Sequence, residues 1–174
     1  MAPKQASCEN QPAYSIQPVT TSEDLVSTTD LFREYAESLD IDLSFQDFNS
    51  EVANMPGKYA HPTGVLLLAR TGDGKPIGCV GLRSLGDPDT CEMKRLYVSP
   101  LGRGMGLGKA LALEALDRAR KMGYRRVRLD TLRSMASAVA LYEKLGFAEV
   151  EPYYHNPTEG TRFLELILEE GRQS

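Results

Sequence analysis

A run of glycines in the middle of the chain has the composition of a phosphate-binding turn. Glycine occupies every second position from Gly102 to Gly108, and basic residues stand within the run and directly after it. Glycine lets backbone N–H groups turn toward an anion without obstruction from a Cβ atom. A helix beginning here would add unpaired donors and about half a positive charge. A turn that only packs closely is the alternative. The expected contacts come from Arg103, Gly104, Met105, Gly106, Leu107, Gly108 and Lys109.

Two common phosphate-binding motifs do not fit this run. A P-loop requires glycine, four further residues and then Gly-Lys-Ser/Thr, but Arg103 stands five residues before Gly108 and Ala110 replaces the hydroxyl residue. A dinucleotide fingerprint, Gly-x-Gly-x-x-Gly, ends on a residue other than glycine from each of its possible starts. The spacing that is present is Arg-x-x-Gly-x-Gly, formed by Arg103, Gly106 and Gly108.

Three segments together resemble the GCN5-related N-acetyltransferase (GNAT) superfamily. The Arg-x-x-Gly-x-Gly spacing matches its pyrophosphate-binding motif, residues 92–98 are similar to its fourth strand, and residues 138–147 are similar to its A-x-x-L-Y-x-x-x-G-F signature. The segments follow one another in the family's order and spacing, over about residues 90–150. The resemblance implies an acetyl-CoA-dependent enzyme, without a metal, that acetylates a primary amine.

Glu92 is the expected general base of such a reaction. An amine with a pKa of about 10.4 is almost wholly protonated at neutral pH, and an ammonium cannot attack a thioester. A base, acting directly or through water, is therefore required. Glu92 lies in a strand of otherwise apolar or long side chains, and the resemblance places it at the position of the catalytic glutamate of several members. The alternative is a structural ion pair with Lys94, Arg95 or a cation elsewhere.

Tyr142 is the expected general acid. By the resemblance, it matches the tyrosine that donates a proton, or a hydrogen bond, to the departing thiolate of coenzyme A. The alternative is a core tyrosine on a short helix, since Leu141, Leu145 and Phe147 around it are packing residues.

The fourth strand is expected to bind the pantetheine arm through its backbone. The resemblance implies that the fourth and fifth strands splay, and that main-chain atoms of Leu96, Tyr97 and Val98 pair with the pantetheine amides. Strict alternation would put Glu92 and Lys94 on the same face as Leu96 and Val98. A β-bulge would relieve this mixture of charged and apolar residues.

One position departs from the family pattern. Relatives often carry an asparagine seven residues before the tyrosine, where it touches coenzyme A, and this chain has Met135 there. We expect Ser134, or the N-terminus of the following helix, to make the contact instead.

Two regions are candidates for recognising the acceptor. The first predicted helices are acidic, which suits a cationic amine, although a solvated helix face explains the same charges. The segment 152–160 is aromatic and rich in turn residues, and His155 within it could assist proton transfer or be a surface residue. The acidic residues are Glu34, Glu37, Asp40, Asp42 and Asp47.

The elements that must position these residues give an α/β (α+β) domain with a mixed sheet. About seven strands and four helices are expected, with the sheet splayed between the fourth and fifth strands as the resemblance implies. A Gly-rich hairpin at 72–75 and a helix stripe at Leu107, Leu111, Ala115 and Ala119 are the clearest local signals. The predicted strands are 14–19, 65–71, 76–85, 90–98, 127–131, 147–151 and 161–169, and the predicted helices are 25–39, 45–52, 107–122 and 134–145.

The composition limits the other possibilities. A chain of 174 residues favours one domain, expected at 13–170 behind a flexible tail at 1–12. A net charge of −4 argues against nucleic acid or an anionic membrane as a general partner. Three cysteines without metal spacing favour reduced thiols and a cytoplasmic location.

The sequence therefore predicts an N-acetyltransferase for a small-molecule amine, as a monomer or homodimer. Acetylation of protein lysines or N-terminal amines is the first alternative, and a non-catalytic acyl-CoA sensor is the second.

Overall fold

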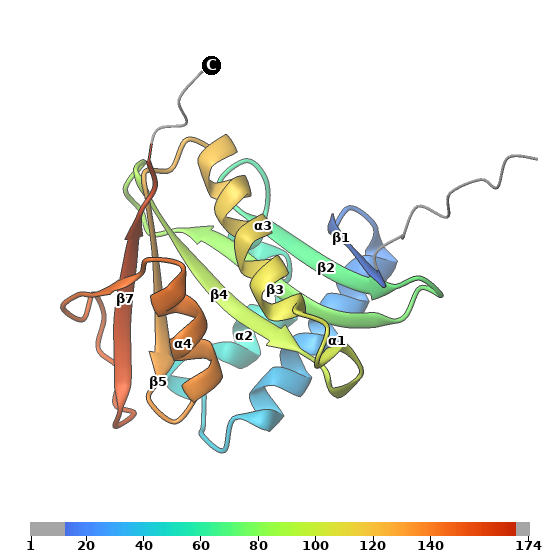
Figure 1. The fold of residues 1–174 in the computed structure, drawn as a ribbon, viewed down its shortest axis with the longest axis horizontal. Helices are drawn as coiled ribbons and strands as arrows, with labels where there is room; N and C mark the ends of the chain where they lie inside the picture. The colour runs from blue at the N-terminus through green and yellow to red at the C-terminus, as the bar shows by residue number, and fades with distance from the viewer. Residues whose placement is uncertain (1–12, 170–174) are drawn as a thin grey trace, which may run out of the picture.

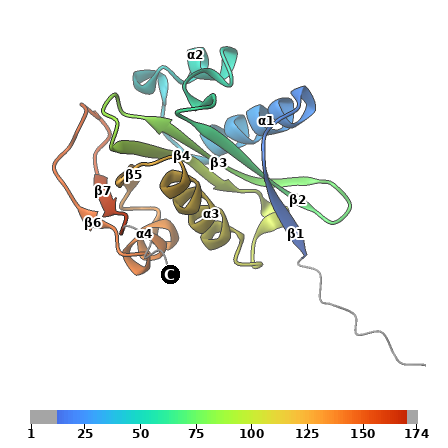
Figure 2. The same ribbon diagram turned by 90° about the horizontal axis from the view of Figure 1, so that it is seen from above.

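The computed structural model describes residues 13–169, which form one sheet with helices on both of its faces (Figures 1 and 2). The elements are, in chain order, β1 (Tyr14–Pro18), α1 (Ser22–Ser38), the 3-10 turn η1 (Ser44–Gln46), α2 (Phe48–Ala53), η2 (Gly57–Tyr59), β2 (Val65–Thr71), β3 (Pro76–Ser84), β4 (Thr90–Val98), η3 (Pro100–Gly102), α3 (Leu107–Lys121), β5 (Arg126–Leu132), α4 (Ala136–Lys144), β6 (Ala148–Glu149) and β7 (Thr161–Ile167).

The sheet has seven strands in the order β1-β2-β3-β4-β5-β7-β6. The β4–β5 pair is parallel and its other pairs are antiparallel. The connection from β4 to β5 runs through α3, as a parallel pair requires. The predicted mixed sheet, splayed between its fourth and fifth strands, is confirmed.

Two apolar layers hold the helices on the sheet. The stripe of α3 buries Leu107, Leu111, Ala115 and Ala119 against one face of the central strands. On the other face, α1 buries Leu31 and Phe32 with side chains from α2 and η2. Figure 2 shows the two layers, with α1 and α2 on one side of the strands and α3 and α4 on the other.

Local interactions explain where α1 begins and why the predicted second helix is divided into η1 and α2. Thr21 caps α1, because its Oγ1 accepts from the Asp24 backbone N–H at 3.1 Å. The prediction of one continuous helix over 45–52 is wrong, because the structure has two separate elements there. Asp47 adopts the left-handed conformation with φ 55°, which separates η1 from α2. Gln46, at the end of η1, consequently reaches the cavity described below.

The predicted tail at 1–12 lies outside the described residues. Within 13–169, no helix has both the length and the apolar character that crossing a bilayer requires.

Candidate active site

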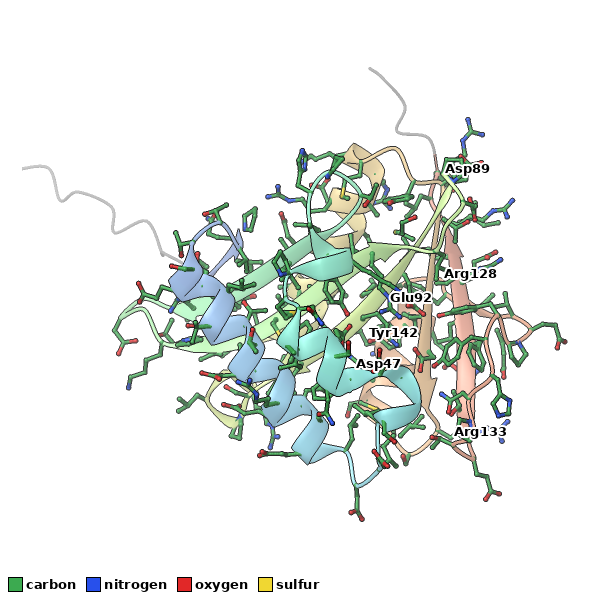
Figure 3. All side chains as sticks on the ribbon, turned by 180° about the vertical axis from the view of Figure 1, so that it is seen from behind. Asp47, Asp89, Glu92, Arg128, Arg133 and Tyr142 are labelled. Carbon is green, nitrogen blue, oxygen red and sulfur yellow. The ribbon has the colours of Figure 1, made fainter. Side chains whose placement is uncertain are left out.

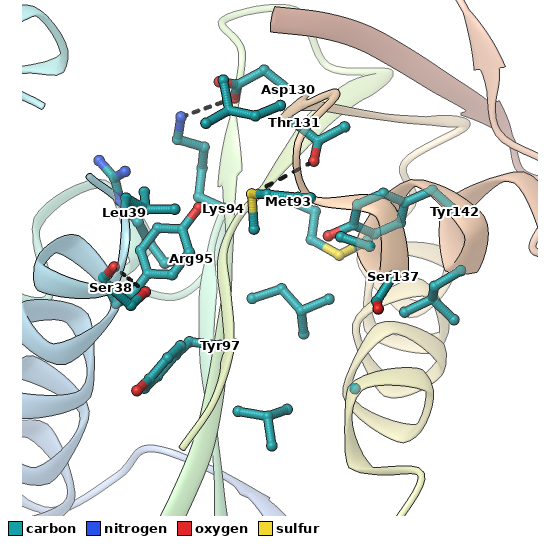
Figure 4. Close-up of a pocket in the computed structure, with 18 of the residues that line it drawn as sticks. Ser38, Leu39, Met93, Lys94, Arg95, Tyr97, Asp130, Thr131, Ser137 and Tyr142 are labelled. Atoms are coloured by element: carbon teal, nitrogen blue, oxygen red, sulfur yellow. Dashed lines mark hydrogen bonds and ion pairs between the residues drawn. The ribbon is translucent and has the colours of Figure 1, made fainter. Parts of the chain in front are cut away.

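A cavity opens where β4 and β5 part. The two strands pair only from Thr90 to Glu92 on β4 and from Arg126 to Arg128 on β5. Beyond these pairs the strands enclose a cavity of about 730 Å³, which is within the usual range for small-molecule sites. Figure 4 shows β4 running through this cavity, with α1 on one side and α3 and α4 on the other. Beyond Glu92, the backbone edge of β4 that faces β5 has no strand partner.

The predicted bulge lies on β4 at the cavity. Gly81 pairs with Lys94 but Cys79 pairs with Tyr97, so β4 carries one extra residue between these pairs. Arg95 takes φ 58° to accommodate it. The bulge changes which face each side chain meets: Met93 packs in the α3 layer before it, and Leu96 packs against the same layer after it. The conflict in the sequence pattern is thereby resolved.

The glycine turn leads into an uncapped helix. Gly104 and Gly106 have φ 80° and 69°, and a Cβ atom at either would meet nothing within 4 Å. Gly106 is the N-cap of α3, where no side chain accepts from the first turn. The N–H groups of that turn therefore lack helical partners. Arg103 and Lys109, both exposed, also line the cavity. Open backbone donors and two cations fit a phosphate group.

The other predicted coenzyme-binding residues divide into two groups. Gly104, Met105, Gly106 and Leu107 are not among the residues lining this cavity, and Leu107 is buried in the α3 layer. The predicted residues that do line the cavity are Leu96, Tyr97, Val98, Arg103, Gly108, Lys109 and Ser134.

The N-terminus of α4 faces the same space. Met135 is the N-cap of α4 and provides no side-chain hydrogen bond to its first turn. Ser134 before it and Ser137 within that turn both line the cavity. A second set of unpaired helix donors is thus available where the sequence led us to expect a contact with coenzyme A from Ser134 or this helix N-terminus.

Tyr142 projects from α4 into the cavity (Figure 4). Its ring packs edge-on against Phe147, with centroids 5.6 Å apart. Within residues 13–169 its hydroxyl makes no hydrogen bond. Burial raises the pKa of this hydroxyl, and nearby Tyr35 and Asp130 add to the effect. The phenol is therefore protonated at neutral pH and free to donate.

Glu92 lies on β4 in the last β4–β5 pair (Figure 3) and is not among the residues that line the cavity. Its side chain is 1% exposed. Oε1 accepts from Arg83 Nε at 2.9 Å and is also 2.9 Å from Arg83 Nη2, while Oε2 accepts from Tyr153 Oη at 2.6 Å. Arg83 stands directly opposite on β3. The structure thus supplies a cation from elsewhere as the ion-pair partner, in place of Lys94 or Arg95.

A buried polar network, which sequence reasoning missed, forms the opposite end of the cavity. Asp130 of β5 accepts from Lys94 Nζ at 3.2 Å and from Tyr154 Oη at 2.7 Å. Gln46 Oε1 accepts from Lys94 Nζ at 3.2 Å and from Arg95 Nη1 at 2.9 Å. Burial alone would raise the pKa of Asp130, but the charge of Lys94 and these hydrogen bonds outweigh it, so the pKa lies below its ordinary value.

The first predicted acceptor region contributes Tyr35, Ser38, Leu39 and Gln46 to the cavity lining, but not its acidic residues. Glu34, Glu37, Asp40, Asp42 and Asp47 are absent from it, and Asp40, Asp42 and Asp47 do not pair with its cations. From the segment 152–160, Asn156 lines the cavity and Tyr154 supports Asp130 from behind, whereas His155 is exposed outside it.

Comparison with known proteins agrees with this geometry. Residues 25–147 match the model of the acetyltransferase (GNAT) family. The chain belongs to this family. It is 42% identical to an uncharacterized N-acetyltransferase of Schizosaccharomyces pombe, over 88% of this chain and 94% of the relative. The family and the acyltransferase class predicted from the sequence are confirmed.

Solved structures share the fold. A GNAT-family acetyltransferase of Staphylococcus aureus has a TM-score of 0.74 at 19% identity, covering 90% of this chain and 100% of its own. A protein of Salmonella typhimurium, whose structure holds its cofactor acetyl-CoA, has a TM-score of 0.69 at 20% identity, covering 92% of this chain and 96% of its own.

Proposed function

We propose that this GNAT protein transfers the acetyl group of acetyl-CoA to a primary amine of a small molecule, by direct attack while both substrates are bound. The observation that supports this proposal is that a single cavity contains room for both substrates. We call the end next to the first turns of α3 and α4 the donor half, and the end next to η1 and Asp130 the acceptor half. Two substrates bound in this cavity would meet at the β4 bulge.

The donor half suits acetyl-CoA. Arg103, Lys109 and the N–H groups after Gly106 would hold its phosphates. The backbone groups of Leu96 to Val98 that face the splay, on the edge not paired with β3, would pair with its pantetheine amides. When bound, acetyl-CoA supplies the thioester that the amine attacks. A C–N bond forms, the C–S bond breaks, the amine nitrogen loses a proton and the sulfur gains one.

The proposed source of the proton for sulfur is Tyr142. Its hydroxyl lines the cavity and is protonated at neutral pH, so it can donate to the charge that develops as the C–S bond breaks.

The base that receives the amine's proton stays a prediction. Glu92 is not among the residues that line the cavity and both of its oxygens accept hydrogen bonds, so its action as a base needs a relay through water. Asp130 does line the cavity, so it is the second candidate for the base, and the effects of replacing Asp130 and Glu92 on kcat have to be compared.

Direct attack is favoured over an acetyl-cysteine intermediate by the described thiols. Cys79 and Cys91 are buried and neither lines the cavity. Burial raises the pKa of both thiols, that of Cys91 to about 12. Because the thiolate is the nucleophile, neither residue is suited to accept the acetyl group.

Release of free thiol from acetyl-CoA, measured with amines, peptides and buffer alone, tests the proposal. We expect turnover with small amines. Turnover confined to peptides would favour protein acetylation, and coenzyme binding without turnover on any acceptor would favour a sensor.

A further inference from the structure

The acceptor half of the cavity carries two buried cations side by side. Lys94 and Arg95 both line the cavity, with side chains 4% and 3% exposed. Consecutive residues of a regular strand point to opposite faces. The bulge at Arg95 removes this alternation, so both side chains meet Gln46 on the same face. Two desolvated cations are thereby concentrated on one wall.

These cations have more donors than their neighbours have acceptors. Lys94 Nζ donates to Gln46 and Asp130, and its other neighbour is the Tyr154 ring, whose centroid is 5.9 Å away, so one of its three N–H groups has no oxygen acceptor among the described residues. Arg95 Nη2 is 2.9 Å from Glu51 Oε2 but is buried without an aligned hydrogen bond. One oxygen, Gln46 Oε1, serves both side chains. A buried donor without a partner is costly, so the wall favours a ligand that brings an acceptor.

Asp130 does not offset this surplus for an incoming ligand. Its Oδ1 accepts from Lys94, and its Oδ2 accepts from Tyr154 at 2.7 Å and from Gln46 at 3.5 Å. Among the described residues that line the cavity, Asp130 is the anionic one, whereas Lys94, Arg95, Arg103 and Lys109 are cationic. An acceptor with additional positive charges would therefore face like charges and an already occupied carboxylate.

We propose that the acceptor amine also carries a carboxylate, as an amino acid does, and that Lys94 binds this carboxylate at the acceptor end of the cavity. A carboxylate supplies charged oxygen acceptors for the unused Lys94 N–H, whereas the charge of Arg95 is already paired with Glu51, whose Oε2 accepts from Arg95 Nε at 3.1 Å. This inference rests on the proposed acetyl transfer, and it narrows the amine to an amino-acid-like class.

The test compares each amino acid of a panel with its own amide, as acceptors for the full-length protein. The amide keeps the amine and side chain but replaces the carboxylate by a neutral group. It also has the less basic amine, so intrinsic reactivity favours the amide and opposes the predicted result. We expect kcat/KM to be at least about tenfold higher for the best amino acid than for its amide. Lys94→Met should raise the KM for that amino acid at least about tenfold and leave the KM for the amide nearly unchanged.

Controls separate binding from folding and from catalysis. Lys94→Arg keeps the charge and should retain most of the preference, and Lys75→Met, at a side chain 64% exposed on the β2–β3 turn, should behave as wild type. Titration of the same pair of acceptors into the protein saturated with coenzyme A measures binding without turnover. The inference would be overturned if amino acid and amide showed equal kcat/KM or equal binding. It would also be overturned if Lys94→Met raised the KM for both acceptors equally. In each case the proposed acetyl transfer would be unaffected. Absence of thiol release with every acceptor would instead count against the proposed function, and carboxylate-dependent binding would still decide the inference.

Discussion

Replacing Tyr142 by phenylalanine separates catalysis from stability at this site. The hydroxyl makes no hydrogen bond within residues 13–169, and the ring contact with Phe147 is kept in the variant. Loss of a hydroxyl that satisfies no partner leaves the free energy of unfolding nearly unchanged. If this hydroxyl protonates the leaving sulfur, kcat should fall about a hundred- to a thousand-fold, with little change in the KM for acetyl-CoA.

Tyr124→Phe is the matched control. Tyr124 is also buried, but its hydroxyl donates to the Thr63 carbonyl at 2.6 Å and does not line the cavity. Its removal leaves that carbonyl unpaired and should cost about 1 kcal/mol, a fall of about 2–4 °C in Tm for a chain of this size, with kcat unchanged.

Thermal unfolding and free-thiol release, measured on both variants, give the comparison. The acid role of Tyr142 is refuted if Tyr142→Phe is folded and its kcat lies within about twofold of wild type. Equal losses of kcat in the two variants would show that the effect arises from the fold.

Three further predictions concern the donor turn and the two carboxylates. Gly106→Ala, which forces an L-residue to φ 69°, should lower the free energy of unfolding by about 1–2 kcal/mol and weaken coenzyme A binding in calorimetry, whereas Gly72→Ala, in open space, should do neither. The folded pKa of Asp130 lies below its unfolded value of about 3.9, so its stabilisation is complete above that pH and is lost as the pH falls through the folded pKa. Denaturation at several pH values should show a stability gap between wild type and Asp130→Asn that is full at pH 7 and closes only below about pH 4. Glu92→Gln should lower the free energy of unfolding by about 3 kcal/mol, because it breaks the buried ion pair with Arg83. If the folded variant has the kcat of wild type, Glu92 is not the base.

The glycine turn at the start of α3 could be predicted from the sequence because it is local. Arg103, Gly106 and Gly108 lie close together in the sequence at the start of α3, and the positive φ of 69° at Gly106 selects glycine there. The bulge was foreseeable for a similar reason: the charged and apolar residues of β4 could not share one face of a regular strand.

The acceptor half could not be predicted, because its residues come from separate segments. Gln46, Lys94, Asp130 and Asn156 meet only once the sheet order and the splay are known. Asp130 gave a weak signal, as a carboxylate within a strand, but nothing in the spacing identified the lysine that it pairs with. The break at Asp47, which brings Gln46 to the cavity, was hidden because its neighbours carry a helical pattern.

The pairing of Glu92 shows a different limit. Arg83 lies directly opposite it across the β3–β4 hairpin, so the ion pair depends on the register of two adjacent strands. The turn between these strands did not fix that register from the sequence.

Acetyl transfer to an amine is tested most decisively by the release of free thiol from acetyl-CoA, with the product mass determined for each acceptor. We expect that release requires both substrates and that the product is the amine bearing one acetyl group. Tyr142→Phe should suppress both signals while still binding coenzyme A. Tight coenzyme A binding with no acetylated product from any amine, amino acid or peptide would contradict the proposed acetyl transfer.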